Sequence, residues 1–169
     1  IGGDGDVSDS FGPSALHLFV QPVGGGSRRQ LPASGYVRTP AWSPDGKTIA
    51  YQRSSSSTGE RNGQIWVVLV EGIGAGRRLV APPSGYLDRD PAWSPDGRHL
   101  AFVRSSTRSG GHDRLLVVPV GEDGRAGRPL TVLERDAILS RPAWSPAGDR
   151  LAVEVGENEV RDLLVVDAG

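Results

Sequence analysis

The chain has 169 residues with 19 basic and 20 acidic side chains, for a formal net charge of −1. Phosphate binding requires a cluster of positive charge, and here basic and acidic side chains are nearly equal in number. The sequence therefore does not predict nucleic acid as a partner. There is no cysteine, which rules out disulfides and Cys-ligated metal sites. No apolar run approaches the length of about 18 residues that a membrane span needs, so we expect none.

Residues 1–14 are mostly Gly, Asp and Ser, and we expect them to form a flexible lead-in. The 24 Gly and 13 Pro of the chain favour short strands and many turns over helices. The chain begins at Ile1 rather than at Met, which indicates a processed product or an excised piece.

The first predicted element is a hairpin, in which an apolar strand over 16–23 is followed by a Gly-rich turn and a return strand over 28–31. The same arrangement recurs twice, with an apolar run, a turn and a return strand that begins with Arg. A fourth apolar run begins near the C-terminal end of the sequence. These later elements are predicted over 65–70 with 77–80, 115–120 with 128–131, and 163–167.

A seven-residue motif separates the hairpins and is present three times, at Pro40–Gly46, Pro91–Gly97 and Pro142–Gly148. Its second proline and its glycine are typical of a tight turn between two strands. In the third copy Ala147 replaces the aspartate of the first two. The turn therefore does not need a carboxylate there, which argues against a catalytic role for Asp45 and Asp96.

The tryptophans of the motif, Trp42, Trp93 and Trp144, are each 51 residues apart. A fixed period near this length is typical of a radial array with one supersecondary unit per repeat. Each full repeat holds four strands, and the third is apolar at nearly every position, as in a strand covered on both faces. The sequence therefore predicts an all-β fold, a β-propeller of four-stranded antiparallel blades of about 51 residues, in a partial ring of three to four blades.

We expect the three tryptophans to fill equivalent gaps between blades, so that replacing any one of them by Ala is severely destabilising. The expected boundaries are a partial blade over 15–34, full blades over 35–84 and 85–135, and a partial blade over 136–169. These blades contain 13 strands, and the last strand is expected to expose an apolar edge over 163–166. Two interpretations stay open: a piece of a larger propeller, or, if the chain is complete, a homo-oligomer that closes the ring.

The motif and the strands after it, over 42–51, 93–102 and 144–153, resemble the PD40 (WD40-like) repeat of TolB-like β-propellers. The resemblance covers nearly the whole chain after residue 15. It departs from the family pattern in its long loops over 54–64 and 105–114 and in Ala147. Related blades occur in the periplasmic TolB protein, in bacterial lipoproteins and sensors, and in the non-catalytic propeller of prolyl-oligopeptidase-like peptidases.

The sequence contains no G-x-S-x-G element, and its three histidines fall at different repeat positions. We therefore predict no catalytic residue, no metal site and no cofactor. In propellers of this kind the loops that lead into the first strand of each blade surround one mouth of the channel, and Tyr and Arg are enriched in interaction hot spots. The predicted binding residues in these loops are Tyr36, Arg38, Tyr86, Asp88, Arg89, Asp90 and Arg141.

The alternative for these loops is structural, with Arg38 and Arg89 in solvated ion pairs with Asp88 or Asp90. At the level of function we favour a non-catalytic TolB-like interaction module that binds a protein or peptide partner in the periplasm or cell envelope. The second hypothesis is the substrate-gating propeller segment of a prolyl-oligopeptidase-like serine peptidase whose catalytic domain is not in this chain.

Overall fold

A computed structural model describes residues 16–33, 35–55, 62–72, 74–157 and 160–169, and these residues form β-strands and their connections. The lead-in expected over 1–14 lies outside the described residues. Thirteen strands are found in the described part of the chain, as the sequence predicts. None of the described segments forms a helix long and apolar enough to cross a membrane.

The strands form a hairpin and three sheets, in which each hydrogen-bonded pair of named strands is antiparallel and consecutive in the chain. An isolated parallel bridge also joins Leu16 to Tyr36. The hairpin consists of β1 (Phe19–Val20) and β2 (Arg29–Gln30). The first sheet contains β3 (Tyr36–Trp42), β4 (Thr48–Ser54), β5 (Gln64–Leu69) and β6 (Arg77–Val80). The second sheet contains β7 (Tyr86–Trp93), β8 (His99–Ser106), β9 (Asp113–Pro119) and β10 (Leu130–Arg135). The third contains β11 (Ile138–Trp144), β12 (Arg150–Glu157) and β13 (Val160–Asp167).

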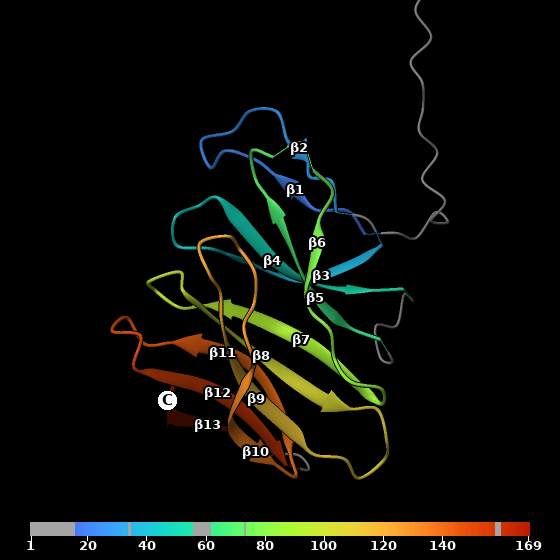
Figure 1. The fold of residues 1–169 in the computed structure, drawn as a ribbon, viewed down its shortest axis with the longest axis vertical. Coiled ribbons are helices and arrows are strands. Elements are labelled where there is room, and N and C mark those ends of the chain that lie inside the picture. Colours follow the sequence, from blue (N-terminus) through green and yellow to red (C-terminus); the bar gives the residue numbers. More distant parts are fainter. Residues whose placement is uncertain (1–15, 34, 56–61, 73, 158–159) are drawn as a thin grey trace, which may run out of the picture.

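The sheets follow one another along the long axis of the molecule, from the blue hairpin to the red strands in Figure 1. We call β3, β7 and β11 the inner strands, because β7 contacts both β3 and β11 in the neighbouring sheets. The two complete four-stranded antiparallel sheets confirm the predicted blades. The return strand expected over 128–131 begins later, at Leu130. Two features delay it. A hydrogen bond from Gly127 N to Pro119 O closes the turn before it, and Pro129 has no N–H to donate to the ladder.

Three apolar clusters hold the array together, one in each space between neighbouring units. The hairpin and the first sheet share a cluster around Leu18 and Tyr51. The first and second sheets share one that includes Ile65 and Phe102. The second and third sheets share one that includes Leu115 and Leu139, with Trp144 packed against it. Burial on both faces explains why β5 and β9 are apolar at almost every position.

The prediction that all three motif tryptophans fill equivalent gaps is wrong for one of them. Trp93 packs against the cluster between the first two sheets, and Trp144 packs against the next cluster and donates from Nε1 to Ala92 O at 3.0 Å. Trp42 is 53% exposed. Each tryptophan faces the sheet that precedes its own. Before the first sheet, the described residues provide only the short hairpin β1–β2. This hairpin covers the cluster around Tyr51 but leaves more than half of Trp42 exposed.

The motif forms the predicted turn, with a positive φ of 70° at Gly46. Ser43 Oγ donates to Asp45 Oδ1 at 2.6 Å, and the same carboxylate accepts from Lys47 N at 3.0 Å. In the third turn, where Ala147 replaces the aspartate, Ser145 Oγ donates instead to Asp149 Oδ1 at 2.7 Å. The serine of the third turn therefore still donates to a carboxylate, but the carboxylate belongs to Asp149, two residues after the position that holds aspartate in the first two turns.

A bulge that the sequence did not predict interrupts each inner strand. In the first sheet Arg38 pairs with Gln52 and Ala41 with Ala50, so two residues lie opposite one. The same shift occurs in β7 and in β11. The residue before the motif proline adopts a left-handed conformation in all three sheets, with φ of 44° at Thr39, 53° at Asp90 and 51° at Arg141. Proline cannot donate to the ladder, and a bulge accommodates it within a paired strand.

Candidate functional site

The predicted binding residues lie in the inner strands themselves and not in the loops before them. Tyr36 and Arg38 are in β3, the residues from Tyr86 to Asp90 are in β7, and Arg141 is in β11. They lie within the first five residues of these strands, and we call the end of the array at which the inner strands begin the entry edge. The bulges lie at the same edge, and bulges re-aim side chains next to functional sites.

Asp88 is fully buried and is held by Arg104 in a two-hydrogen-bond pair. Arg104 donates from Nε to Asp88 Oδ1 at 2.7 Å and from Nη2 to Oδ2 at 2.8 Å. Burial raises the pKa of Asp88, and the bonds from Arg104 oppose that rise. Asp88 is therefore a structural residue beneath the entry edge, and its partner is Arg104 rather than Arg38 or Arg89.

Arg89 is the centre of an ionic cluster that joins the second sheet to the third. It donates to Asp90 Oδ2 and to Asp113 Oδ2, each at 2.8 Å. Asp113 Oδ2 also accepts from Leu139 N at 3.0 Å, and Asp90 Oδ2 accepts from Arg141 N at 3.4 Å. The ion pair expected between Arg89 and Asp90 is thus present. It is largely buried rather than solvated and fixes the position of β11.

The remaining predicted residues present side chains to solvent along the same edge. The guanidinium of Arg114 lies over the ring of Tyr86, with Arg114 Cζ 5.5 Å from the centroid of that ring. Arg141 is 78% exposed and is paired through Nη1 with Glu154 Oε1 at 3.0 Å. The bond from Arg141 lowers the pKa of Glu154. Tyr36 is half-buried opposite Ser54 and Arg38 is exposed, so both belong to the first-sheet part of the edge.

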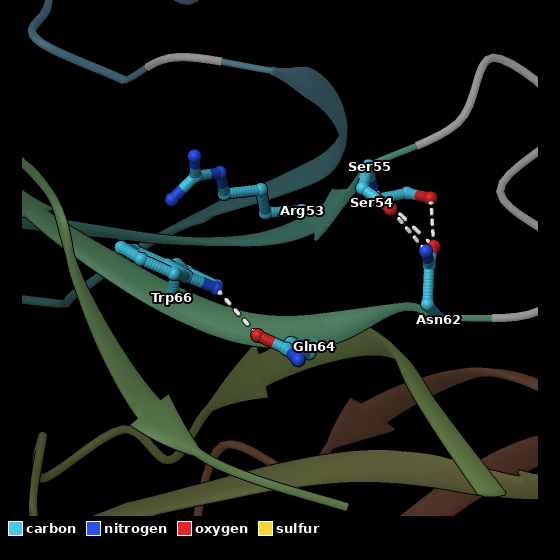
Figure 2. Close-up of a pocket in the computed structure, with 6 residues that line it drawn as sticks. All are labelled: Arg53, Ser54, Ser55, Asn62, Gln64 and Trp66. Carbon is cyan, nitrogen blue, oxygen red and sulfur yellow. Dashed lines mark hydrogen bonds between the residues drawn. The ribbon is translucent and has the colours of Figure 1, made fainter. Parts of the chain in front are cut away.

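A pocket of about 250 Å³ opens at the entry edge of the first sheet, beside the ends of β4 and β5 (Figure 2). The guanidinium of Arg53 lies over the indole of Trp66, with Cζ 4.1 Å from the ring centroid. Trp66 Nε1 donates to Gln64 Oε1 at 3.3 Å, and Ser54 Oγ donates to Asn62 Oδ1 at 2.5 Å. The lining is polar around one aromatic ring, which suits a hydrogen-bonding ligand group.

Comparing the sheets explains why Arg53 and Arg104 behave differently although they share a repeat position. In the second sheet the residue opposite Arg104 in the ladder is Asp88, which binds it. In the first sheet the residue opposite Arg53 is Val37, and the guanidinium stacks on Trp66 instead. One repeat position therefore provides an internal ion pair in the second sheet and a pocket wall in the first.

Three of the charged residues that hold the predicted ones in place were not predicted from the sequence, namely Asp113, Arg114 and Glu154. Their partners lie across a sheet or in the next sheet, so spacing along the chain did not reveal them. Aligning the repeats with each other gives one signal, because Asp88 of the second repeat replaces Val37 of the first. In the described part of the chain, no cluster of three or more His, Cys, Asp or Glu is arranged to hold a metal ion.

Successive four-stranded antiparallel sheets, joined by their inner strands, define the chain as part of a β-propeller. The family model "Lipoprotein LpqB beta-propeller domain" matches residues 68–169, more than half of the chain. The chain therefore belongs to the lipoprotein LpqB β-propeller domain family.

Individual proteins agree with this class. The structure of a putative TolB from Agrobacterium tumefaciens superposes with a TM-score of 0.65 and 22% identity, over 90% of this chain and 54% of that one. "Uncharacterized peptidase YuxL" of Bacillus subtilis is 32% identical over 130 residues, which is 75% of this chain and 18% of the relative. "Tol-Pal system protein TolB 1" of Novosphingobium aromaticivorans is 35% identical over 80 residues, 47% of this chain and 16% of the relative. The chain thus spans less than a fifth of either curated relative.

Proposed function

We propose that the chain is a non-catalytic, TolB-like interaction module that binds a protein or peptide partner at its entry edge. The repeated bulge is the observation that carries this proposal. A polar residue sits in a left-handed conformation at the same position of all three inner strands. Such strain costs on the order of 1 kcal/mol or more per residue and clusters at functional sites.

The side chains at this edge are suited to protein recognition. Tyr36 and Tyr86 offer aromatic surface, and Arg38 and Arg141 offer exposed guanidinium groups. Tyr and Arg are among the residues that contribute most to protein interfaces. The ionic cluster around Arg89 holds the edge rigid, which reduces the entropy lost on binding.

The proposed compartment is the periplasm or the cell envelope. Support comes from the lipoprotein family and from the similarity to a Tol-Pal system protein. The PD40 repeat assignment is part of the same proposal and rests on the motif that contains each of the spaced tryptophans.

Site-specific photo-crosslinking in an envelope extract tests the binding proposal. A photoreactive residue replaces Arg38 or Arg141 at the entry edge, and the matched controls carry it at Lys47 or Arg98, in turns at the opposite ends of the strands. We expect the entry-edge positions to give one saturable adduct. A variant that carries the photoreactive residue at position 38 together with Arg141→Glu should no longer form it. Equal labelling from both ends of the strands would refute binding at this edge.

A second candidate is a substrate-gating propeller segment of a serine peptidase. The 32% identity to a Bacillus subtilis peptidase over three quarters of this chain favours it. The discriminating observation is the sequence encoded after Gly169. A G-x-S-x-G element within an α/β-hydrolase domain there, with peptide hydrolysis by the longer chain, would replace the first proposal by the second.

A further inference from the structure

A pocket of about 520 Å³ opens between the first and second sheets, at the end of the array opposite the entry edge. Both of these sheets have four strands, so the pocket does not arise from a missing neighbour. Its counterpart between the second and third sheets has a volume of about 170 Å³. The two spaces are equivalent in the repeat, since Thr48 pairs with Leu69 beside the first and His99 pairs with Pro119 beside the second. We call the larger space the Thr48 pocket.

One aromatic ring distinguishes the two spaces. The centroid of the His99 ring lies 6.4 Å from that of Trp144, within the range of paired aromatic side chains. Nδ1 of the same imidazole is 4.0 Å from Asp96 Oδ1, in the turn of its own sheet. Thr48 takes the position of His99 in the first sheet and has no ring. The place that an imidazole fills beside Trp144 is therefore open beside Trp93.

The Thr48 pocket offers an indole and a carboxylate to such a ring. Trp93 borders the pocket, and its Nε1 is buried and has no hydrogen-bond acceptor in the described part of the chain. Asp45 also belongs to the lining, and its Oδ1 accepts from Ser43 Oγ and from Lys47 N. Neither of these bonds uses Oδ2, so that oxygen can accept from a ligand N–H.

The rim of the pocket favours a neutral or cationic ring over an anion. Glu122 and Asp123 line it together with the turn carboxylate, which places three acidic groups against Lys47 and Arg77. Arg77 reaches across to the second sheet and donates from Nη2 to Gly124 O, so its guanidinium is already engaged. The wall between these groups includes the apolar last residues of β5. Small-molecule sites typically combine apolar walls with a few converging polar groups in a volume of this order.

We propose that the Thr48 pocket binds a small nitrogen heteroaromatic ligand of the imidazole type, with its ring against Trp93 and a ring N–H directed to Asp45. The bound ring repeats, between the first two sheets, the arrangement that the imidazole of His99 has between the next two. The volume accommodates a fused bicyclic ring, so benzimidazole is the probe. The site lies at the opposite end of the strands from the entry edge and does not depend on the partner proposed there.

Titration of the chain with benzimidazole, followed through the indole N–H resonances in NMR spectra, tests this proposal. We expect a saturable shift of the Trp93 resonance, which is assigned by its loss in Trp93→Phe. Indene has the same fused-ring shape but no nitrogen, so it lacks the bond to Asp45 and should bind about tenfold more weakly or worse. Equal binding of indene would overturn recognition of the ring nitrogen. The absence of any saturable shift at Trp93 would overturn the site.

Thr48→His is the deciding variant, because it supplies from the chain itself the ring that the second sheet has at this position. It should remove the benzimidazole shift at Trp93. The matched control is Thr107→His, at an exposed position that follows β8 near the entry edge, and it should leave the shift unchanged. A shift that survives Thr48→His would overturn the proposal.

Two further variants keep the test independent of how Thr48→His folds. Asp45→Asn keeps the shape of the side chain but removes its charge, so it should weaken benzimidazole binding severalfold and leave indene binding unchanged. His99→Thr opens the space beside Trp144 and should create a second saturable shift, at the Trp144 resonance. Undiminished benzimidazole binding in Asp45→Asn would overturn the proposed N–H contact and, with it, the choice of ligand.

Discussion

The guanidinium of Arg104 and the carboxylate of Asp88 form two hydrogen bonds, at 2.7 and 2.8 Å, in the interior between the first and second sheets. Asp88 is 0% exposed and Arg104 is 9% exposed. Breaking a buried pair by removing one partner leaves an uncompensated charge and costs about 3–5 kcal/mol. We therefore expect Asp88→Asn to lower the free energy of unfolding by about that amount, as measured by urea denaturation.

Replacing both members of this pair is the control. Asp88→Val with Arg104→Met substitutes apolar side chains of similar volume and introduces the Val that the first sheet has at position 37. Such replacements are often neutral or stabilising. The double variant should recover most of the stability that Asp88→Asn loses. If the two variants are equally unstable, the ion pair is not the cause of the loss.

The three motif tryptophans should differ in their contribution to stability. Trp93 and Trp144 are partly buried and pack against clusters between sheets, so replacing either by Ala should cost up to about 3–5 kcal/mol, the cost for a buried Trp. Trp42 is more than half exposed, so in dilute protein Trp42→Ala should cost much less, about 1 kcal/mol or under. Denaturation of the three variants side by side measures this order. A Trp42→Ala loss as large as that of Trp144→Ala would contradict it.

The sequence was sufficient for the repeat, the strand count and the four-stranded sheets, because Trp42, Trp93 and Trp144 recur in one turn motif and β-strand patterns surround each copy. It was not sufficient for the exposure of Trp42, which depends on the sheet in front of it rather than on its own motif. Similar local sequence therefore produced similar turns and strands, whereas the burial of each tryptophan depended on its position in the array.

The residues of the entry edge were expected in loops but lie in β3, β7 and β11, and the side chains that hold them were only partly predicted. Arg89 was singled out from its repeat position, yet its second carboxylate partner, Asp113, is 24 residues away and belongs to a different strand. The bulges at Thr39, Asp90 and Arg141 were also missed, because a residue before proline ordinarily favours an extended conformation. Only the paired register of the neighbouring strand shows that each inner strand has an extra residue at this point.

The third turn should depend on Asp149, which supplies the carboxylate that Ala147 cannot. The bond from Ser145 holds the pKa of Asp149 below its usual value. A lowered folded pKa gives stability that is present above the unfolded pKa, near 3.8, and is lost as the pH falls. Asp149→Ala should therefore lower the melting temperature at neutral pH, and the difference from the parent should shrink towards about pH 3.

Rebuilding the turn of the second repeat provides the control for this prediction. Ala147→Asp combined with Asp149→Arg recreates the order Ser-Pro-Asp-Gly-Arg found at Ser94–Arg98. This double variant should melt at the parent temperature if the turn needs one carboxylate on its serine. Failure to recover, with Asp149→Ala still destabilised, would assign Asp149 a role outside the turn.

Tyr51 should resist ionisation until strongly alkaline pH. Its side chain is in the cluster between the hairpin and the first sheet, and burial raises the pKa of Tyr51 to about 12, against 10.0 ordinarily. Since the folded state then binds the phenolic proton more tightly than the unfolded state, stability is fully present below pH 10.0 and is lost as the pH rises through about 12. Tyrosinate absorbance should therefore contain a component that appears only near this pH.

Tyr51→Phe, which copies Phe102 at the equivalent place in the second sheet, should abolish that component and keep the packing. Persistence of the component in Tyr51→Phe would show that another tyrosine is its source.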